Sequence, residues 1–166
     1  MKQIGLLLAC MFLLSCNSKA QTEKQDKVFP VTKTEAEWKA QLTEMQYYIL
    51  REAGTERPFT SNFNYFKGEG VFHCAACNTP LFETQYKFDS GTGWPSFDRA
   101  IEGNVEYDVD YKLGYARTEE HCATCGGHLG HVFNDGPRAT TGKRHCINGA
   151  ALVFVGEVDG NEGKND

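Results

Sequence analysis

The chain has 166 residues, of which 40% are hydrophobic and 23% are charged, and its formal net charge is −5. These proportions are ordinary for a globular protein, so they exclude a disordered or fibrous chain. The length is enough for one folded domain with its own core. Because the net charge is negative and no basic stripe is present, we expect no binding to nucleic acid.

The N-terminus is typical of an exported lipoprotein. The apolar residues 4–14 are too few to span a bilayer, and the LLSC that ends them at 13–16 resembles the lipobox of bacterial lipoproteins. We expect residues 1–15 to be a signal peptide and Cys16 to carry a lipid. That lipid would anchor the protein to a membrane on the periplasmic side of the bacterial envelope. An ordinary secretory signal, in which Cys16 has no role, is the alternative.

Three segments are expected after the signal peptide. Residues 16–33 are polar and charged, which predicts a lipidated tether. Residues 34–159 should form the folded domain. The polar residues 160–166 predict a flexible tail.

Helices should precede strands in the domain. Thr34 and Glu37 match a capping box, so a short helix is predicted to begin there, and a second helix is predicted over residues 43–53 and is ended by Gly54. Beyond residue 57 the helical period gives way to aromatic and β-branched residues punctuated by Gly, Asn and Asp, which indicates antiparallel strands. The predicted strands are residues 71–73, 81–82, 105–113, 132–133 and 151–155. The expected fold is therefore mainly β, with antiparallel sheets in one compact domain and short N-terminal helices.

Four of the seven cysteines form two Cys-x2-Cys pairs. The four are Cys74, Cys77, Cys122 and Cys125. Such pairs are typical of zinc knuckles, and two knuckles would give one zinc ion four sulfur ligands with no open position, so this site would be structural. Two disulfides are the alternative, which an oxidising compartment favours. The paired spacing favours zinc.

Cys146 is the one cysteine outside the signal segment, the lipobox and the two pairs. Arg144 and His145 precede it, and their positive charge should favour the thiolate, which is the nucleophilic form. The alternative is a buried free cysteine that packs as a small hydrophobic residue.

Two histidines and a tryptophan are further candidates for a site. His128 and His131 lie in a glycine-rich segment after the second cysteine pair, and an imidazole can give a proton near neutral pH. Additional metal ligands or purely structural histidines are the alternatives. Trp94 lies between glycine and proline in SGTGWPSF, a stiff loop that could hold an aromatic wall beside a pocket. A core position for Trp94 is the alternative.

Taken together, these segments resemble the methionine-R-sulfoxide reductase family, also called type B. The resemblance runs from about residue 37 to 154. It covers GTERPF at 54–59, CAAC at 74–77, KFDSGTGWPSF at 87–97, RTE at 117–119, CATCGGHLGHVFNDGP at 122–137 and RHCINGAAL at 144–152. It implies an enzyme with a mostly antiparallel β fold and one structural zinc ion, which reduces the R epimer of methionine sulfoxide.

The resemblance also assigns roles to individual residues. The implied catalytic residues are Cys146, His128, His131 and Asn148, and the implied substrate-binding residues are Trp94, Arg144 and Phe133. The cysteine would attack the sulfoxide sulfur and become a sulfenic acid, while the histidines orient and protonate the oxygen. The indole would pack against the substrate methyl group.

Three positions depart from the family pattern. Many relatives carry a resolving cysteine where this chain has Thr92, His145 stands where tyrosine is usual, and Gly149 stands where serine is usual. Without a resolving thiol, we expect an external thiol such as a thioredoxin-like donor to reduce the sulfenic acid. The expected substrate is methionine sulfoxide in oxidised proteins, and the expected state is a monomer.

Two other classes of function fit parts of the pattern. A zinc-ribbon module could bind a small ligand beside Trp94 without chemistry. A thiol peroxidase also oxidises a reactive cysteine to a sulfenic acid. A binding module has no use for a reactive Cys146, and relative rates with sulfoxide and peroxide separate the two enzymes.

Overall fold

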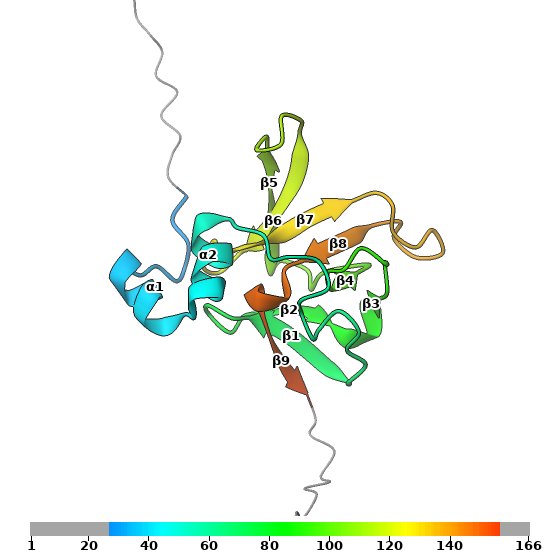
Figure 1. Cartoon of the computed structure of the whole chain (residues 1–166), viewed down its shortest axis with the longest axis horizontal. Helices are drawn as coiled ribbons and strands as arrows, with labels where there is room; N and C mark the ends of the chain where they lie inside the picture. Colours follow the sequence, from blue (N-terminus) through cyan, green and yellow to red (C-terminus); the bar gives the residue numbers. More distant parts are fainter. Residues whose placement is uncertain (1–26, 157–166) are drawn as a thin grey trace, which may run out of the picture.

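The computed structural model describes residues 27–156, which form two short helices followed by antiparallel strands (Figure 1). The elements are α1 (Glu35–Gln41), α2 (Glu44–Glu52), β1 (Gly70–Cys74), β2 (Pro80–Glu83), η1 (Thr84–Tyr86), β3 (Lys87–Phe88), β4 (Ser96–Phe97), β5 (Val105–Asp110), β6 (Arg117–Cys122), β7 (His128–Phe133), β8 (Arg144–Ile147), η2 (Gly149–Ala151) and β9 (Leu152–Gly156). The predicted signal peptide, the lipidated Cys16, most of the tether and the tail lie outside the described residues. Within them, no helix has the length and apolar character needed to cross a membrane.

The strands form two antiparallel sheets. One has three strands in the order β2-β1-β9, and the other has six in the order β3-β4-β8-β7-β6-β5. The prediction of a mainly β domain with antiparallel sheets and short N-terminal helices is confirmed. In Figure 1 the β5–β6 hairpin extends away from the body of the domain.

Local signals explain both helices. The Thr34 side chain accepts a hydrogen bond from the backbone N–H of Glu37, whose carboxylate accepts one from the Thr34 N–H at 2.8 Å. Thr43 and Gln46 make the same capping box at the start of α2. These reciprocal bonds satisfy N–H groups that have no partner inside a helix, so both helices begin where the capping threonines lie.

The end of α2 differs from the prediction. Ala53, with φ of 50°, takes the left-handed conformation that ends the helix, and Gly54 follows it. A Cβ on Gly54 would lie 2.3 Å from the Tyr48 ring, which would have to move to admit it. The stop therefore comes one residue earlier than glycine preference indicates.

Several strand predictions need correction. The predicted strand over residues 105–113 ends at Asp110, whose carboxylate accepts the Lys112 N–H in a turn at 2.7 Å. The short prediction at residues 132–133 is the end of the longer β7. The strands β3, β4, β6 and β8 were not predicted. The sequences of β6 and β8 lack the usual alternation of apolar and polar residues. Polar side chains in these strands, such as Glu120 and His145, are buried because they pair with each other.

Aromatic side chains join the two sheets. Phe72 of β1 meets Phe97 of β4 with ring centroids 5.3 Å apart, and Phe82 of β2 stacks on Phe97 at 4.5 Å. All three rings are fully buried, and Ile49 and Leu50 of α2 join the same core. Burial of this apolar area is the main force that holds the sheets together.

The last residues of the predicted tether lie against the domain. The Val31 N–H donates to the carbonyl of Thr124 at 2.9 Å. The Phe29 ring meets His121 edge-on at 5.7 Å and covers Gly126, where a Cβ would lie 2.4 Å from that ring. Packed structure thus begins several residues before the first helix.

Candidate active site and metal centre

A cavity of about 130 Å³ lies beside the paired strands β7 and β8. In this pair Cys146 is opposite His131, and Arg144 is opposite Phe133. Directly opposed residues of antiparallel strands share a face, with Cβ atoms about 4.5–5.5 Å apart. The cavity is lined by Thr55, Trp94, Arg117, Gly130, His131, Phe133, Cys146 and Asn148. Larger surface depressions of about 570 to 870 Å³ contain none of the predicted catalytic, substrate-binding or metal residues.

The structure brings five of the seven predicted catalytic and substrate-binding residues to this cavity. They are Cys146, His131, Asn148, Trp94 and Phe133. The Trp94 side chain is half-buried, and its Nε1–H donates to the carbonyl of Glu56 at 3.2 Å. The indole is therefore a wall of the cavity rather than part of the core.

Arg144 and His128 lie behind the lining. The Arg144 guanidinium makes two hydrogen bonds of 2.9 Å to the Asp135 carboxylate and lies 4.5 Å over the Phe133 ring. His128 contacts the Glu119 carboxylate through Nδ1 at 2.6 Å, and its ring is 5.5 Å from that of His131. Both residues thus support side chains that face the cavity.

His131 is held by a carboxylate that sequence reasoning missed. Its Nε2 lies 2.8 Å from the Asp110 carboxylate, which also pairs with Arg117. Burial alone would raise the pKa of Asp110, but hydrogen bonds from the Lys112 backbone, His131 and Arg117 lower it to about 2. Burial lowers the pKa of His131 below its usual value, although Asp110 opposes the shift. A neutral His131 therefore donates Nε2–H to an ionised Asp110 and keeps Nδ1 as a proton acceptor.

The pKa of Cys146 departs from the expectation of a ready thiolate. Burial raises the pKa of the Cys146 thiol, and the nearby charge of Arg144 offsets only part of that rise. His145 adds no such help, because successive residues of a strand point to opposite faces. Its Nδ1 instead contacts the buried Glu120 carboxylate. The resting pair is thus a neutral thiol beside a neutral imidazole.

Alkylation of Cys146 should therefore keep accelerating with pH. We expect the iodoacetamide rate to rise about tenfold per pH unit between about pH 6 and 8, because only the thiolate reacts and its pKa lies above that range. Mass spectrometry of the Cys146 peptide measures this rate, with Cys146→Ser as the blank. A plateau below pH 7 would show a preformed thiolate and contradict the assignment.

Hydroxyl groups surround the position of the missing resolving cysteine. The Ser90 Oγ lies 2.8 Å from both the Thr92 and Ser96 hydroxyl oxygens. Ser96 pairs with Cys146 across β4 and β8, and a hydrogen bond from Thr92 lowers the pKa of the Cys146 thiol, against the larger effect of burial. Thr92 thus influences the Cys146 thiol but offers it no sulfur for a disulfide.

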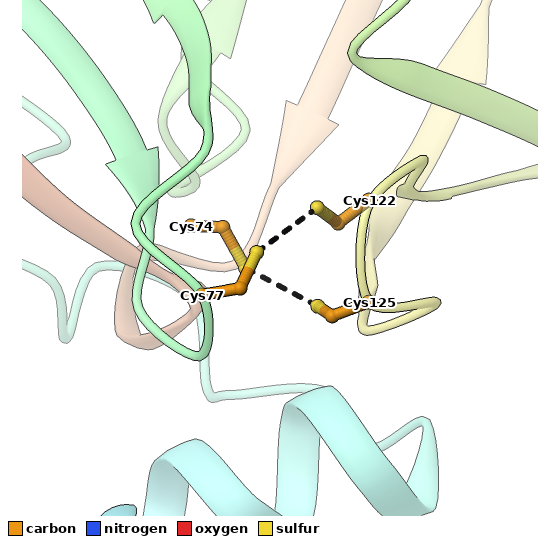
Figure 2. Close-up of side chains that lie close together, drawn as sticks. All are labelled: Cys74, Cys77, Cys122 and Cys125. Carbon is orange, nitrogen blue, oxygen red and sulfur yellow. Dashed lines mark hydrogen bonds between the residues drawn. The ribbon is translucent and has the colours of Figure 1, made fainter. Parts of the chain in front are cut away.

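The four paired cysteines converge on one point, as Figure 2 shows. Cys74 and Cys122 are the last residues of β1 and β6, and Cys77 and Cys125 lie in the turns that follow these strands. Their sulfur atoms all lie within 4.8 Å of one another, and contacts of 3.7 Å and 3.5 Å join the two turns, from Cys74 to Cys125 and from Cys77 to Cys122. This cluster can hold a metal ion.

The donor set fits zinc. Four zinc–sulfur bonds of about 2.3 Å in a tetrahedron would place the sulfur atoms about 3.8 Å apart, close to the observed contacts. The observed contacts are well above the roughly 2.05 Å of a disulfide bond, and all five described cysteines are free. The arrangement favours a metal over two disulfides.

Sequence reasoning missed four residues around the cavity. They are Thr55, Glu56, Asp110 and Arg117. Three of them lie in the GTERPF and RTE segments that carry the family resemblance, so a signal for them was present. Asp110 lies inside a predicted strand, and it is brought to His131 by the pairing of β5 with β6 and of β6 with β7.

Comparisons with known proteins agree with this arrangement. The SelR domain family matches residues 42–156. Peptide methionine sulfoxide reductase MsrB of Chromohalobacter salexigens is 50% identical over 125 residues, which cover 75% of this chain and 94% of that protein. The protein of the same name from Burkholderia lata is 49% identical over 133 residues, covering 80% of this chain and 93% of that one.

Two further similarities are weaker in coverage or in fold. Peptide methionine sulfoxide reductase B1, chloroplastic, of Oryza sativa subsp. japonica is 54% identical over 120 residues, which cover 72% of this chain and 56% of that protein. The crystal structure of the Mis18 'Yippee-like' domain has a TM-score of 0.44 and 18% identity, and covers 54% of this chain and 97% of that chain. That structural similarity is too low to add to the assignment.

The fold and the site together define a small antiparallel β domain with a four-cysteine cluster and one isolated thiol beside an imidazole. The chain belongs to the SelR domain family, the type B peptide methionine sulfoxide reductases, as the resemblance predicted.

Proposed function

We propose that the protein reduces methionine-R-sulfoxide in oxidised proteins to methionine, with Cys146 as the nucleophile. One observation carries the proposal: a partly buried thiol, an imidazole fixed by a carboxylate and an indole line the same cavity. Family membership supplies the reaction class. The resemblance to the methionine-R-sulfoxide reductases implies the R epimer, and the rule that each type of reductase acts on one epimer supports this selectivity.

The first half-reaction transfers oxygen from one sulfur to another. The Cys146 thiol gives its proton to Nδ1 of His131 as it attacks the sulfoxide sulfur, and His131 passes the proton to the sulfoxide oxygen. The attack forms a bond between the two sulfur atoms. That bond breaks as the protonated oxygen leaves the substrate sulfur and forms a sulfur–oxygen bond on Cys146. Methionine sulfoxide is reduced by two electrons to methionine, and the cysteine is oxidised to a sulfenic acid.

The second half-reaction regenerates the thiol. One external thiol condenses with the sulfenic acid, which releases water and forms a mixed disulfide, and a second thiol then frees Cys146 as the donor disulfide forms. Thr92 supports this route because it stands where a resolving cysteine would act. The other four described cysteines belong to the metal cluster. A thioredoxin-like protein suits the role.

The cysteine cluster would bind one zinc ion through Cys74, Cys77, Cys122 and Cys125. With four sulfur ligands the ion has no open position, so it stabilises the fold and takes no part in the reaction. We further propose that a lipid on Cys16 holds this domain, as a monomer, on the periplasmic side of a bacterial membrane. The lipobox and the polar tether support that location.

A stereospecific assay tests the function. The protein should reduce a peptide with R-methionine sulfoxide, using dithiothreitol or thioredoxin, and leave the S epimer unchanged. Comparable rates with both epimers would contradict the proposed selectivity. Faster oxidation of Cys146 by hydrogen peroxide than by sulfoxide would favour a thiol peroxidase. Binding without turnover of either epimer would favour a ligand-binding module.

A further inference from the structure

We propose that Glu56 is a positioning residue that holds the indole and the amide of the active-site cavity in place. The role of Glu56 in catalysis rests on the function proposed above. Glu56 lies in the GTERPF segment at 54–59, to which the sequence assigned no role. It is 7% exposed and does not line the catalytic cavity.

The carboxylate of Glu56 ties its segment to the turn that follows the nucleophile. Its Oε1 accepts the Gly149 N–H at 2.6 Å, and its Oε2 accepts the Ala150 N–H at 3.0 Å. Both oxygens are therefore used, and both donors belong to η2, which begins three residues after Cys146. Hydrogen bonds to an ionised acceptor are stronger than neutral ones, so this clamp is strong for its size.

The backbone of Glu56 then places two cavity residues. Its N–H donates to the Asn148 side-chain oxygen at 3.0 Å, and its carbonyl accepts the Trp94 Nε1–H at 3.2 Å. The Asn148 amide is fixed at its other end because Nδ2 donates to the Leu129 carbonyl at 2.9 Å. One buried residue thus connects the indole on one loop with the amide beside the nucleophile.

The residues around the clamp are closely packed at Gly149. A Cβ on Gly149 would lie 1.9 Å from the Ser61 hydroxyl oxygen and 3.3 Å from the Glu56 Oε1. On the other side the Phe59 N–H donates to the Gly93 carbonyl at 2.7 Å, which holds the segment against the Trp94 loop. A side chain at Gly149 would thus collide with Ser61 before it crowded Glu56.

Glu56→Gln tests the role with little change in shape. The amide keeps one acceptor but turns its NH2 group toward a backbone donor, so one clamp bond is lost. We expect kcat/KM for an R-methionine sulfoxide peptide to fall about 10- to 100-fold, since displacements near 1 Å have costs of that order. Alkylation of Cys146 should stay within about twofold of the parent, because burial, Arg144 and Thr92 set the pKa of its thiol and Glu56 is hydrogen-bonded to neither of those side chains.

Asp98→Asn is the matched control. Asp98 is also a buried carboxylate, at 6% exposed, but its side chain pairs with Arg99, which is not a residue of the cavity lining. The variant Asp98→Asn should lower the thermal midpoint of unfolding, as Glu56→Gln does. Its kcat/KM, measured well below that midpoint, should stay near the parent value. Should Glu56→Gln be unfolded at the assay temperature, Glu56→Asp carries the same test with both oxygens kept.

Fluorescence reports the environment of the Trp94 indole and does not depend on turnover. The chain has two tryptophans, so Trp38→Phe leaves Trp94 as the single emitter. Adding Glu56→Gln should shift its emission to longer wavelength and increase quenching by acrylamide, whereas adding Asp98→Asn should do neither. Unchanged emission, or equal loss of kcat/KM in both variants, overturns the proposal. A parent without reductase activity would refute the proposed function, and the fluorescence result would still decide whether Glu56 places Trp94.

Discussion

Replacing Cys146 with serine should abolish reduction of methionine sulfoxide and leave the fold intact. A serine hydroxyl is a far weaker nucleophile than a thiol, and it has no sulfur to accept the oxygen, so no sulfenic acid can form. We expect the turnover rate to fall by at least about 10⁴-fold, the scale seen when a nucleophile is removed. Chromatography of a peptide with R-methionine sulfoxide, with dithiothreitol as reductant, measures the loss.

The structure predicts that this variant is otherwise normal. Serine differs from cysteine by one atom, and position 146 keeps its backbone pairing with Ser96 and His131. Metal content by elemental analysis and the thermal midpoint of unfolding should match those of the parent. Turnover above about 1% of the parent rate would mean that another group attacks the sulfoxide, and the assignment of Cys146 would fall.

The parts of the fold that depend on neighbouring residues were predictable from the sequence. The capping box at Thr34 acts within four residues, so its helix could be placed before any tertiary contact was known. The strand β8 could not be placed in the same way, because its sequence RHCI looks exposed. His145 is buried only because Glu120 of β6 faces it, and that pairing joins residues 25 apart in the sequence.

The difference between local and long-range contacts also explains which features of the candidate site were predicted correctly and which were missed. The cysteine spacing predicted the metal cluster because two short knuckles are local units. The expected effect of His145 on the Cys146 thiol was wrong, because charge was counted along the sequence while strand alternation sends the two side chains to opposite faces. Asp110 reaches His131 through two strand pairings, and no spacing in the sequence reveals that contact.

Loss of the metal should unfold the domain rather than change its chemistry. The cluster joins the turn after β1 to the turn between β6 and β7, and so links the two sheets. The helices attach to the same turns, because the Gln41 side chain donates to the Ala76 carbonyl at 2.6 Å and the Arg51 guanidinium donates to the Cys125 carbonyl at 2.9 Å. Removing the ion would leave crowded sulfur groups at the point where all these elements meet.

Cys125→Ser should therefore bind no metal and be unfolded, or nearly so, at room temperature. Zinc bound by four thiolates contributes about 10 kcal/mol or more to folding in small domains, which is comparable to the total stability of roughly 5–15 kcal/mol for a typical protein. Circular dichroism and elemental analysis check both properties. Cys146→Ser is the matched control, since it also removes one thiol but should hold about one zinc ion per chain. If Cys125→Ser were metal-free yet melted at the parent temperature, the cluster would have no structural role, and the two turns would have to be held together by packing alone.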